Sequence, residues 1–342
     1  MYMNSTPFNT KRLLKQLGLL AAALMLALLA ACGSDEKTTS EKPQDEQQQQ
    51  QQQTEEKNAA AEQTDSEQPA ATVYPLTVKD DSCTEITLEK APERIVTIVP
   101  SETEVAFAVG AGDRVVGVDS YSNYPEQAAS IDKIGDMTSD VEKIASLKPD
   151  LILASVSMNS QAIEQLRQLK LNVYASDPKT YAAVMDKIRR IGEITDTQQK
   201  ASEVVAHMQQ VKDEVEAKVK DVAKPNVFLE FSPGYTVGKG EFLDELLTIA
   251  GGQNVATGKG WYEFDAEQIV ANNPAVIVYS SWYEEPNAIL EGIKGRPAWK
   301  EIDAVKNNKL VEVAQDPLVR VGPRLADGLM DLAKAIHPDL FQ

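Results

Sequence analysis

The chain has 342 residues, which is enough for one or two sizeable hydrophobic cores. Its 52 acidic residues outnumber the 34 basic ones, for a formal net charge of −18. This acidity excludes a nucleic-acid-binding function, because such proteins need a clustered basic face. Only two cysteines occur, so a disulfide framework is also excluded.

The N-terminal segment reads as a secretory signal. Basic residues precede the uncharged run Leu17–Ala31, which is short for a membrane span. The run ends in Leu29-Ala30-Ala31-Cys32, which resembles a bacterial lipobox. That resemblance implies that residues 1–31 are a lipoprotein signal peptide and that Cys32 becomes lipidated, by diacylglycerol with acyl chains such as palmitate. Cys83 would then be a lone thiol, which we expect to be partly buried.

Residues 32–72 read as a tether that follows the lipid anchor. They contain almost no large apolar side chains and include an unbroken glutamine run, Gln47–Gln53. Such a segment cannot bury enough apolar surface to offset its chain entropy, so we predict an acidic, glutamine-rich disordered tether. Its end-to-end distance would be roughly 35 Å. A domain held in this way stays at the extracytoplasmic face of a membrane but can still reorient.

Short apolar strands alternate with helical patterns in residues 73–177. This alternation predicts an N-terminal α/β lobe with a parallel sheet covered by helices. The predicted strands are Arg94–Val99, Val115–Val118, Leu151–Ala154 and Asn172–Tyr174, and the predicted helices include Glu102–Val109 and Gln161–Leu169.

A connecting helical segment, residues 178–224, joins this lobe to the next. From Asp196, the predicted N-cap, to about Asp221 the chain has no Gly or Pro, and its apolar residues recur at helical spacing. About 25 residues at 1.5 Å each give a helix roughly 38 Å long. Such a helix should hold two lobes at a nearly constant separation.

The same alternation of strands and helices returns in residues 225–342, the predicted C-terminal α/β lobe. Strands are predicted at Val227–Phe231, Val276–Tyr279 and Leu310–Val313, and a helix at Phe242–Ala250 that Gly251 and Gly252 end. The predicted fold class is therefore α/β, with two Rossmann-like lobes joined by one long rigid α-helix and a ligand cleft between the lobes.

The two lobes share a phrase of sequence. Asp140-Val141-Glu142-Lys143-Ile144 precedes Pro149 and an apolar strand, and Asp265-Ala266-Glu267-Gln268-Ile269 precedes Pro274 and another, 125 positions later. Each copy reads as a short helix capped by Asp, ended before Pro and followed by a buried strand. Each lobe should therefore present one Glu, Glu142 or Glu267, on the first turn of an equivalent helix.

From about Tyr74 to its end, the chain resembles the helical-backbone class of bacterial substrate-binding proteins, which serve ABC importers of cobalamin and ferric siderophores. The motifs that carry the resemblance are Ala91-Pro92-Glu93-Arg94-Ile95-Val96, Pro100-Ser101-Glu102-Thr103-Glu104, Gly112-Asp113-Arg114-Val115-Val116-Gly117-Val118, Tyr121-Ser122-Asn123-Tyr124-Pro125 and Leu147-Lys148-Pro149-Asp150-Leu151. They occur in the order expected for the family.

The resemblance implies a partner and a docking mode. In that family a surface Glu of each lobe pairs with Arg residues of the permease, and the matching positions here are Glu142 and Glu267. The implied partners are an ABC permease with its ATPase, a small-molecule ligand and the membrane, with the binding protein itself a monomer. Glutamates on first helical turns are also favoured by the helix dipole alone, which is the alternative reading of both residues.

The ligand should bind between the lobes, in the loops that leave the strand ends. Flat rings in these loops suit a large planar or apolar ligand, and an arginine can hold a carboxylate or catecholate bidentately. The candidate ligand-binding residues are Tyr121, Tyr124, Tyr235, Trp261, Tyr262, Trp282, Asp316 and Arg320. Four of them, Tyr121, Trp261, Asp316 and Arg320, match pocket positions of cobalamin binders in the family.

The ligand remains open between a corrinoid and a ferric siderophore. Met137 and Ser155 stand where the cobalamin-binding pattern has aromatic residues. Haem is a further alternative, because Met or Tyr can be axial ligands even though His207 and His337 lie outside the expected pocket loops. Two histidines are too few for a zinc or manganese site, so no metal site and no cofactor are predicted.

A surface-anchored hydrolase is the rival from another functional class. The chain has no Gly-x-Ser-x-Gly nucleophile elbow and no evident set of nucleophile, base and orienting residue. We therefore predict a binding protein without catalytic residues. A receptor or adhesion lipoprotein without an importer is the third possibility.

Overall fold

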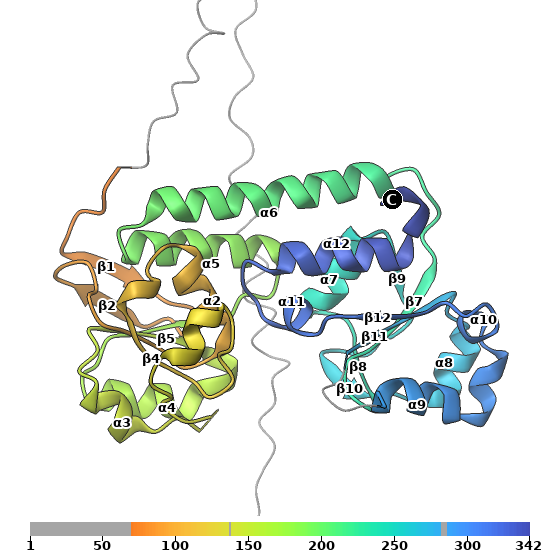
Figure 1. The fold of residues 1–342 in the computed structure, drawn as a ribbon, viewed down its shortest axis with the longest axis horizontal. Coiled ribbons are helices and arrows are strands. Elements are labelled where there is room, and N and C mark those ends of the chain that lie inside the picture. Colours follow the sequence, from red (N-terminus) through yellow and green to blue (C-terminus); the bar gives the residue numbers. More distant parts are fainter. Residues whose placement is uncertain (1–69, 137, 282–285) are drawn as a thin grey trace, which may run out of the picture. The chain divides into compact units, whose positions relative to one another are not determined.

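The computed structural model describes residues 70–136, 138–281 and 286–342 (Figure 1). The predicted signal peptide, Cys32 and most of the predicted tether lie outside the described residues, and so do Met137 and Trp282. None of the described helices is both long and apolar enough to cross a membrane.

The N-terminal lobe opens with an antiparallel hairpin of β1 (Leu76–Lys79) and β2 (Glu85–Leu88). Cys83 lies in the turn of this hairpin with φ +64° and is exposed, so the expectation of a partly buried thiol was wrong. A parallel sheet follows, in the order β4-β3-β5-β6. Its strands are β3 (Ile95–Thr97), β4 (Val115–Val118), β5 (Leu151–Ser155) and β6 (Val173–Ser176).

Helices connect these strands as the alternating pattern predicts. They are α2 (Pro100–Ala108), the 3-10 turns η2 (Gly112–Arg114) and η3 (Glu126–Ser130), α3 (Val141–Ser146) and α4 (Val156–Gln168). The helix α4 begins at Val156, five residues before the predicted start at Gln161, and is kinked at Asn159, whose backbone is not helical. The predicted helix corresponds to the part of α4 that follows this kink.

The C-terminal lobe holds a second four-stranded sheet, in the order β12-β11-β7-β9. Its strands are β7 (Asn226–Glu230), β9 (Gln253–Asn254), β11 (Val276–Ser280) and β12 (Leu310–Val313), and β8 (Tyr235–Val237) pairs with β10 (Trp261–Glu263) in a separate antiparallel hairpin. The helical elements are α7 (Phe242–Ile249), α8 (Ala266–Asn272), α9 (Ala288–Gly295), η4 (Pro297–Glu301), α10 (Asp303–Lys306), α11 (Asp316–Val319), α12 (Leu325–Ile336) and η5 (Pro338–Leu340).

The two four-stranded sheets have the same topology. When the strands are numbered in chain order within each lobe, both sheets read 2-1-3-4, and every neighbouring pair is parallel. The strands β5 and β11, at 151–155 and 276–280, are offset by the same 125 positions as the duplicated phrase. The phrase therefore marks structurally equivalent elements, as the sequence predicts.

The long helix between the lobes is α6 (Gln198–Val219), preceded by α5 (Tyr181–Ile194). Its 22 residues span about 33 Å. Figure 1 shows α6 passing over α5 at one end and alongside α12 at the other. The predicted N-cap was wrong: Thr197 occupies that position, and Asp196 adopts a left-handed conformation, where its carboxylate accepts a hydrogen bond from the Thr72 amide at 2.7 Å.

The largest hydrophobic core extends through both lobes. Alternate strand residues face it, including Leu151 and Leu153 from β5 and Val227 and Leu229 from β7, together with Met208 of α6 and other residues of α5, α7 and α12. The opposite faces of the two sheets have separate cores under the other helices. Because the lobes share buried apolar surface beneath α6, that helix is part of a packed layer rather than an isolated connection.

Candidate functional site

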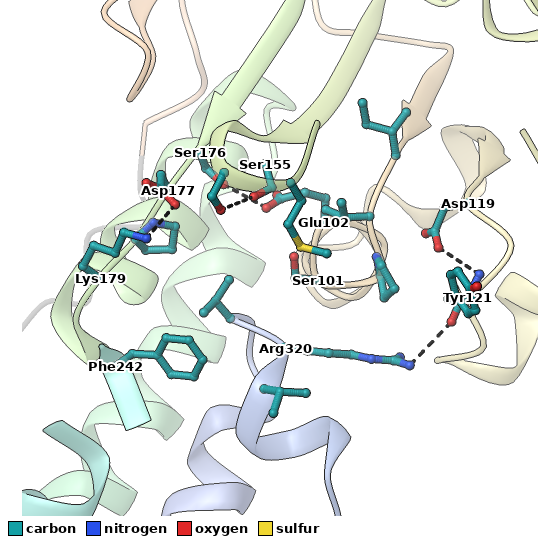
Figure 2. Close-up of a pocket in the computed structure, with 18 of the residues that line it drawn as sticks. Ser101, Glu102, Asp119, Tyr121, Ser155, Ser176, Asp177, Lys179, Phe242 and Arg320 are labelled. Carbon is teal, nitrogen blue, oxygen red and sulfur yellow. Dashed lines mark hydrogen bonds and ion pairs between the residues drawn. The ribbon is translucent and has the colours of Figure 1, made fainter. Parts of the chain in front are cut away.

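A cavity of about 480 Å³ lies between the two lobes (Figure 2). One wall comes from the segments that directly follow β3, β4, β5 and β6, so the carboxyl ends of all four N-terminal strands open into it. The other wall comes from the start of α7, from Trp261 of β10 and from the segment after α11. The sheet order changes direction between β3 and β5, which is the position where open α/β sheets bind ligands.

The structure brings three of the predicted ligand-binding residues to this cavity: Tyr121, Trp261 and Arg320. The Tyr121 and Trp261 side chains are 60% and 43% exposed, which leaves their rings accessible to a ligand. Tyr121 follows β4 in the N-terminal lobe and the other two belong to the C-terminal lobe, so a ligand in contact with all three would touch both lobes.

The other predicted residues that the structure describes do not line this cavity. Tyr124 lines a second cavity and its ring stacks on Arg324, with 4.1 Å from the guanidinium carbon to the ring centroid. Tyr235 is exposed on β8, and the Tyr262 hydroxyl accepts a hydrogen bond from the Gly258 amide at 3.1 Å. Asp316 does not line the cavity but pairs with Arg320 at 2.8 Å.

Several lining residues were missed by the sequence analysis, which selected aromatic residues at the strand ends. The missed residues are mainly small, hydroxyl-bearing or acidic and lie at the ends of the four N-terminal strands or soon after them: Pro100, Ser101, Glu102, Asp119, Ser157, Met158, Ser176, Asp177, Pro178 and Lys179. Ser155, which the sequence analysis noted only as a departure from the cobalamin-binding pattern, also lines the cavity. Glu241 and Phe242, at the start of α7, were missed as well. A search for residues at the carboxyl ends of the predicted strands would have identified the lining residues of the N-terminal lobe, because the carboxyl ends of parallel strands meet at one edge of a sheet.

Arg320 joins the lobes as well as lining the cavity. Its guanidinium donates to Glu104 of α2 at 3.0 Å and to the Asn123 side chain at 2.8 Å, and Figure 2 shows it extending toward Tyr121. Arg324 also donates to Glu104, at 2.6 and 2.8 Å. The Glu104 side chain is 1% exposed, so two C-terminal arginines hold one buried N-terminal carboxylate.

A second buried ion pair stands behind the cavity wall. The Lys187 ammonium of α5 donates to Glu102 of α2 at 2.8 Å and to the Val321 carbonyl of the C-terminal lobe at 2.6 Å. The Ser176 hydroxyl donates to the same Glu102 oxygen at 2.8 Å. A buried lysine and a buried carboxylate both lose their hydration, so each needs an ion-pair partner and hydrogen bonds to compensate for that loss.

Asp119 carries the third buried carboxylate near the cavity, and its residue is 2% exposed. It accepts hydrogen bonds from the Tyr121 amide at 2.8 Å and from the Ser122 hydroxyl, which in turn contacts Thr103 at 2.7 Å. Burial raises the pKa of the Asp119 carboxyl, and the hydrogen bonds from Ser122 and Tyr121 oppose this change.

The two predicted docking residues, Glu142 and Glu267, are both exposed, on the first turns of α3 and α8. The caps below them are as predicted: the Asp140 side chain accepts from the Lys143 amide, and the Asp265 side chain accepts from the Glu267 and Gln268 amides. These caps set the start of each helix and thereby place each glutamate on a first turn.

Neither histidine lies at the cavity between the lobes. His207 lines the second cavity, beside Tyr124, and the His337 ring contacts the Gly251 carbonyl at 3.1 Å. Within the described ranges, no group of three or more His, Cys, Asp or Glu side chains is arranged to hold a metal ion.

Comparison with known proteins places this geometry in a family. The ABC transporter substrate-binding lipoprotein YvrC of Bacillus subtilis is 36% identical over 293 residues, which cover 82% of this chain and 92% of that protein. The crystal structure of the periplasmic vitamin B12-binding protein BtuF of Vibrio cholerae is similar with a TM-score of 0.66 and 28% identity, covering 73% of this chain and 99% of that one.

A periplasmic haem-binding protein from Pseudomonas aeruginosa has a similar structure, with a TM-score of 0.64 and 25% identity over 72% of this chain and 93% of that one. Its fold, like that of the vitamin B12-binding protein, has two α/β lobes of the helical-backbone class. Residues 95–317, which hold both four-stranded sheets and most of the residues that line the cavity, match the periplasmic binding protein family. The chain belongs to the periplasmic binding protein family.

Proposed function

We propose that this protein is the extracytoplasmic solute-binding lipoprotein of an ABC importer and that it carries a corrinoid or a ferric siderophore to the permease. The observation that carries the proposal is the cavity itself, whose walls come from both lobes at the carboxyl ends of parallel strands. Relatives with the same fold are named for binding vitamin B12 or haem. Family members are solute-binding components of importers rather than enzymes, so we assign no catalytic residue.

The ligand would lie against Tyr121 and Trp261, with the hydroxyls of Ser101, Ser155 and Ser176 as hydrogen-bonding partners. Trp282, which lies outside the described residues, and Tyr124, Tyr235, Tyr262 and Asp316 remain predicted contacts that would require a larger ligand or a local rearrangement. Arg320 would act mainly by closing the cavity floor, because Glu104, Asp316 and Asn123 already occupy its donors.

Delivery would use Glu142 and Glu267 as two negatively charged contacts for arginines of the permease. Both carboxylates are exposed on equivalent helices, and their lobes share a hydrophobic core. A monomer anchored through lipidated Cys32 and its tether would dock with both contacts at once. Because the lobes are packed together, closure on the ligand should be small, and the docked permease would release the ligand by separating the lobes.

Haem is a second candidate ligand, favoured by one observation at the cavity. Both Met158 and Tyr121 line it with substantial exposure, and methionine and tyrosine can each be an axial ligand of haem iron. A shift of the Soret absorption band on titration with hemin, abolished by Tyr121→Phe or Met158→Leu, would support this alternative.

A binding panel tests the proposal. The purified full chain in detergent is titrated with cyanocobalamin, a hydroxamate ferric siderophore, a catecholate ferric siderophore and hemin, and its melting temperature is recorded. A ligand at 100 times its Kd stabilises the native state by about 2.7 kcal/mol, so the correct class should raise the melting temperature by several degrees. The proposed function would be overturned if none of the four ligands raised the melting temperature and none changed the fluorescence of the protein.

A further inference from the structure

Acidic side chains dominate the cavity between the lobes. Among the described lining residues, four carboxylates stand against two cations: Glu102, Asp119, Asp177 and Glu241 against Lys179 and Arg320. A cavity with mostly one sign of charge and low-dielectric walls attracts the opposite charge and repels its own. The charge of the lining therefore bears on which ligands can enter.

Both lining cations are already paired within the protein. The Arg320 side chain is 10% exposed and contacts Glu104 at 3.0 Å and Asp316 at 2.8 Å. Lys179 pairs with Asp177 at 3.2 Å. An anionic ligand would have to take one of these cations from its partner, and in the case of Arg320 it would leave the buried Glu104 less compensated.

Two lining carboxylates, in contrast, have capacity for a donor. The Glu102 side chain is 1% exposed; its Oε1 atom accepts from Lys187 and Ser176, whereas its Oε2 atom has no hydrogen-bond partner in the described part of the chain. The Glu241 side chain lies at the cavity edge and makes no hydrogen bond or ion pair with any described residue. Buried carboxylate oxygens are stabilised by donors, so the lining favours a ligand that supplies N–H or ammonium groups.

Helix N-termini at the cavity do not reverse this preference. The first turns of α2 and α7 carry their own acids, Glu102 on α2 and Asp244 and Glu245 on α7. Glu245 also accepts a hydrogen bond from the Tyr181 amide at the start of α5, at 2.6 Å. These carboxylates complement the positive ends of the three helices. Neither α4 nor α5 has an acid of its own in its first turn; Glu245 of α7 serves the start of α5, and a neutral carbonyl of a ligand would satisfy the start of α4, which lines the cavity.

We infer that the cavity selects a neutral or cationic ligand rich in amide or ammonium donors and discriminates against ligands that present clustered carboxylates or catecholates. The inference rests on the proposed function and narrows its substrate class. Amide groups suit the lining in particular, because the hydroxyls of Ser101, Ser155, Ser157 and Ser176 can donate to their carbonyls or accept from their N–H groups. By the same argument hemin, with two propionates, is disfavoured.

Four probes of differing charge test the selectivity. The full chain is titrated, with tryptophan fluorescence as the readout, against cyanocobalamin (uncharged amide side chains), ferrioxamine B (a hydroxamate complex with a terminal ammonium), hemin, and a ferric tris-catecholate complex. We expect cyanocobalamin or ferrioxamine B to bind at least about tenfold more tightly than both anionic probes, a difference of about 1.4 kcal/mol. Tighter binding of either anionic probe overturns the charge selection while leaving the proposed function intact. Binding of none overturns the proposed function and this inference with it.

A pair of variants separates lining charge from ligand shape. Asp177→Asn with Glu241→Gln removes two lining charges, and Asp213→Asn with Glu214→Gln makes the same chemical changes on the exposed face of α6. The first variant should raise the affinity for the anionic probes relative to that for the neutral and cationic probes by roughly three- to tenfold at low salt, and by less at high salt. The α6 variant should leave this ratio within about twofold of its original value. An equal ratio in both variants would contradict the inference.

Discussion

Glu102 and Glu104 lie two residues apart near the start of α2, and each is bound to cations from other parts of the chain. Glu102 contacts Lys187 of α5, and Glu104 contacts Arg320 and Arg324 of the C-terminal lobe. Both carboxylates are almost fully buried. At the scale of single residues, the Glu104 pairs connect the two lobes directly, and Lys187 adds a link by donating to the Val321 carbonyl of the C-terminal lobe.

We predict that Glu104→Ala strongly destabilises the protein. The substitution removes the acceptor of three guanidinium hydrogen bonds and leaves two partly buried cations with fewer counter-charges. Removal of one partner from such a pair should lower the free energy of unfolding by about 2–4 kcal/mol, measured by urea denaturation. Glu93→Ala, which breaks the exposed Lys90–Glu93 pair, is the control and should change the free energy of unfolding little. A Glu104→Ala effect as small as that of the control would contradict the role of the pair.

We predict that Asp119→Asn changes the pH dependence of stability. Burial raises the pKa of Asp119 in the folded protein, so the folded state binds this proton more tightly than the unfolded state. This contribution to stability is present below the usual carboxyl pKa and is lost as the pH rises through the raised value. The free energy of unfolding of the variant and of the original protein is measured by urea denaturation at about pH 4 and pH 7. The difference, variant minus original, should be more favourable to the variant at pH 7 than at pH 4.

Asp136→Asn is the matched control of opposite sign. Hydrogen bonds from the Thr138 amide and hydroxyl lower the pKa of Asp136, so its contribution to stability is present at neutral pH and lost as the pH falls. This variant should lose stability relative to the original protein at the higher pH. A loss of relative stability at the higher pH in Asp119→Asn, as expected for Asp136→Asn, would refute the assignment for Asp119.

At the scale of elements, α3 and α8 show how one phrase of sequence produces one local structure twice. Each begins at an Asp cap and buries one isoleucine, Ile144 or Ile269. Each is followed by a left-handed residue, Lys148 or Asn273, directly before a proline. Local residue types therefore determine both ends of the helix, and the buried isoleucine determines which face is exposed.

We predict that Asp265→Ala and Glu267→Ala have different effects on stability. Asp265 accepts backbone hydrogen bonds at 2.8 and 3.4 Å, so its loss should lower the free energy of unfolding by about 1 kcal/mol, as for other N-caps. The Glu267 side chain makes no hydrogen bond with any described residue, and its removal should change thermal stability much less. If Glu267→Ala were the more destabilising change, Glu267 would be a structural residue rather than a free docking contact.

At the scale of the whole folded part, residues 70–342 as described, the shared core beneath α6 makes the two lobes one packed unit. Val227 and Leu329 of the C-terminal lobe belong to the same buried cluster as Leu151 of the N-terminal lobe. A solute-binding protein with this packing keeps Glu142 and Glu267, the proposed docking residues, at a nearly constant separation. The spacing of Glu142 and Glu267 can then act as a recognition feature for a permease.

We predict that the double substitution Glu142→Ala, Glu267→Ala separates ligand binding from transport. Both residues are exposed and distant from the cavity lining, so the Kd for ligand should change by less than about twofold. Uptake of the same ligand by cells should fall at least about tenfold, because two charged contacts with the permease are lost. Glu214→Ala with Glu216→Ala, on the exposed face of α6, is the control and should support normal uptake. Uptake at the original rate in the Glu142, Glu267 variant would exclude the docking role.

Local signals in the sequence determined much of this protein. Runs rich in β-branched and other apolar residues predicted β4 and β12 to the residue, although β12 contains the exposed Glu312 and is only partly buried. The duplicated phrase predicted α3, α8 and the exposure of Glu142 and Glu267. The absence of Gly and Pro predicted α6, although Thr197 rather than Asp196 begins it.

Only the tertiary structure decided which side chains meet at the cavity. Tyr121 and Tyr124 are three positions apart in one loop, yet they line different cavities, and the Tyr124 ring stacks on Arg324 of the C-terminal lobe. The sequence predicts that Arg320 binds an anionic group of the ligand, but in the structure Arg320 pairs with Glu104, 216 positions away. Partners so distant in the chain leave no local pattern. The fold therefore followed from periodicity, whereas the charge of the site followed from long-range pairing that packing alone establishes.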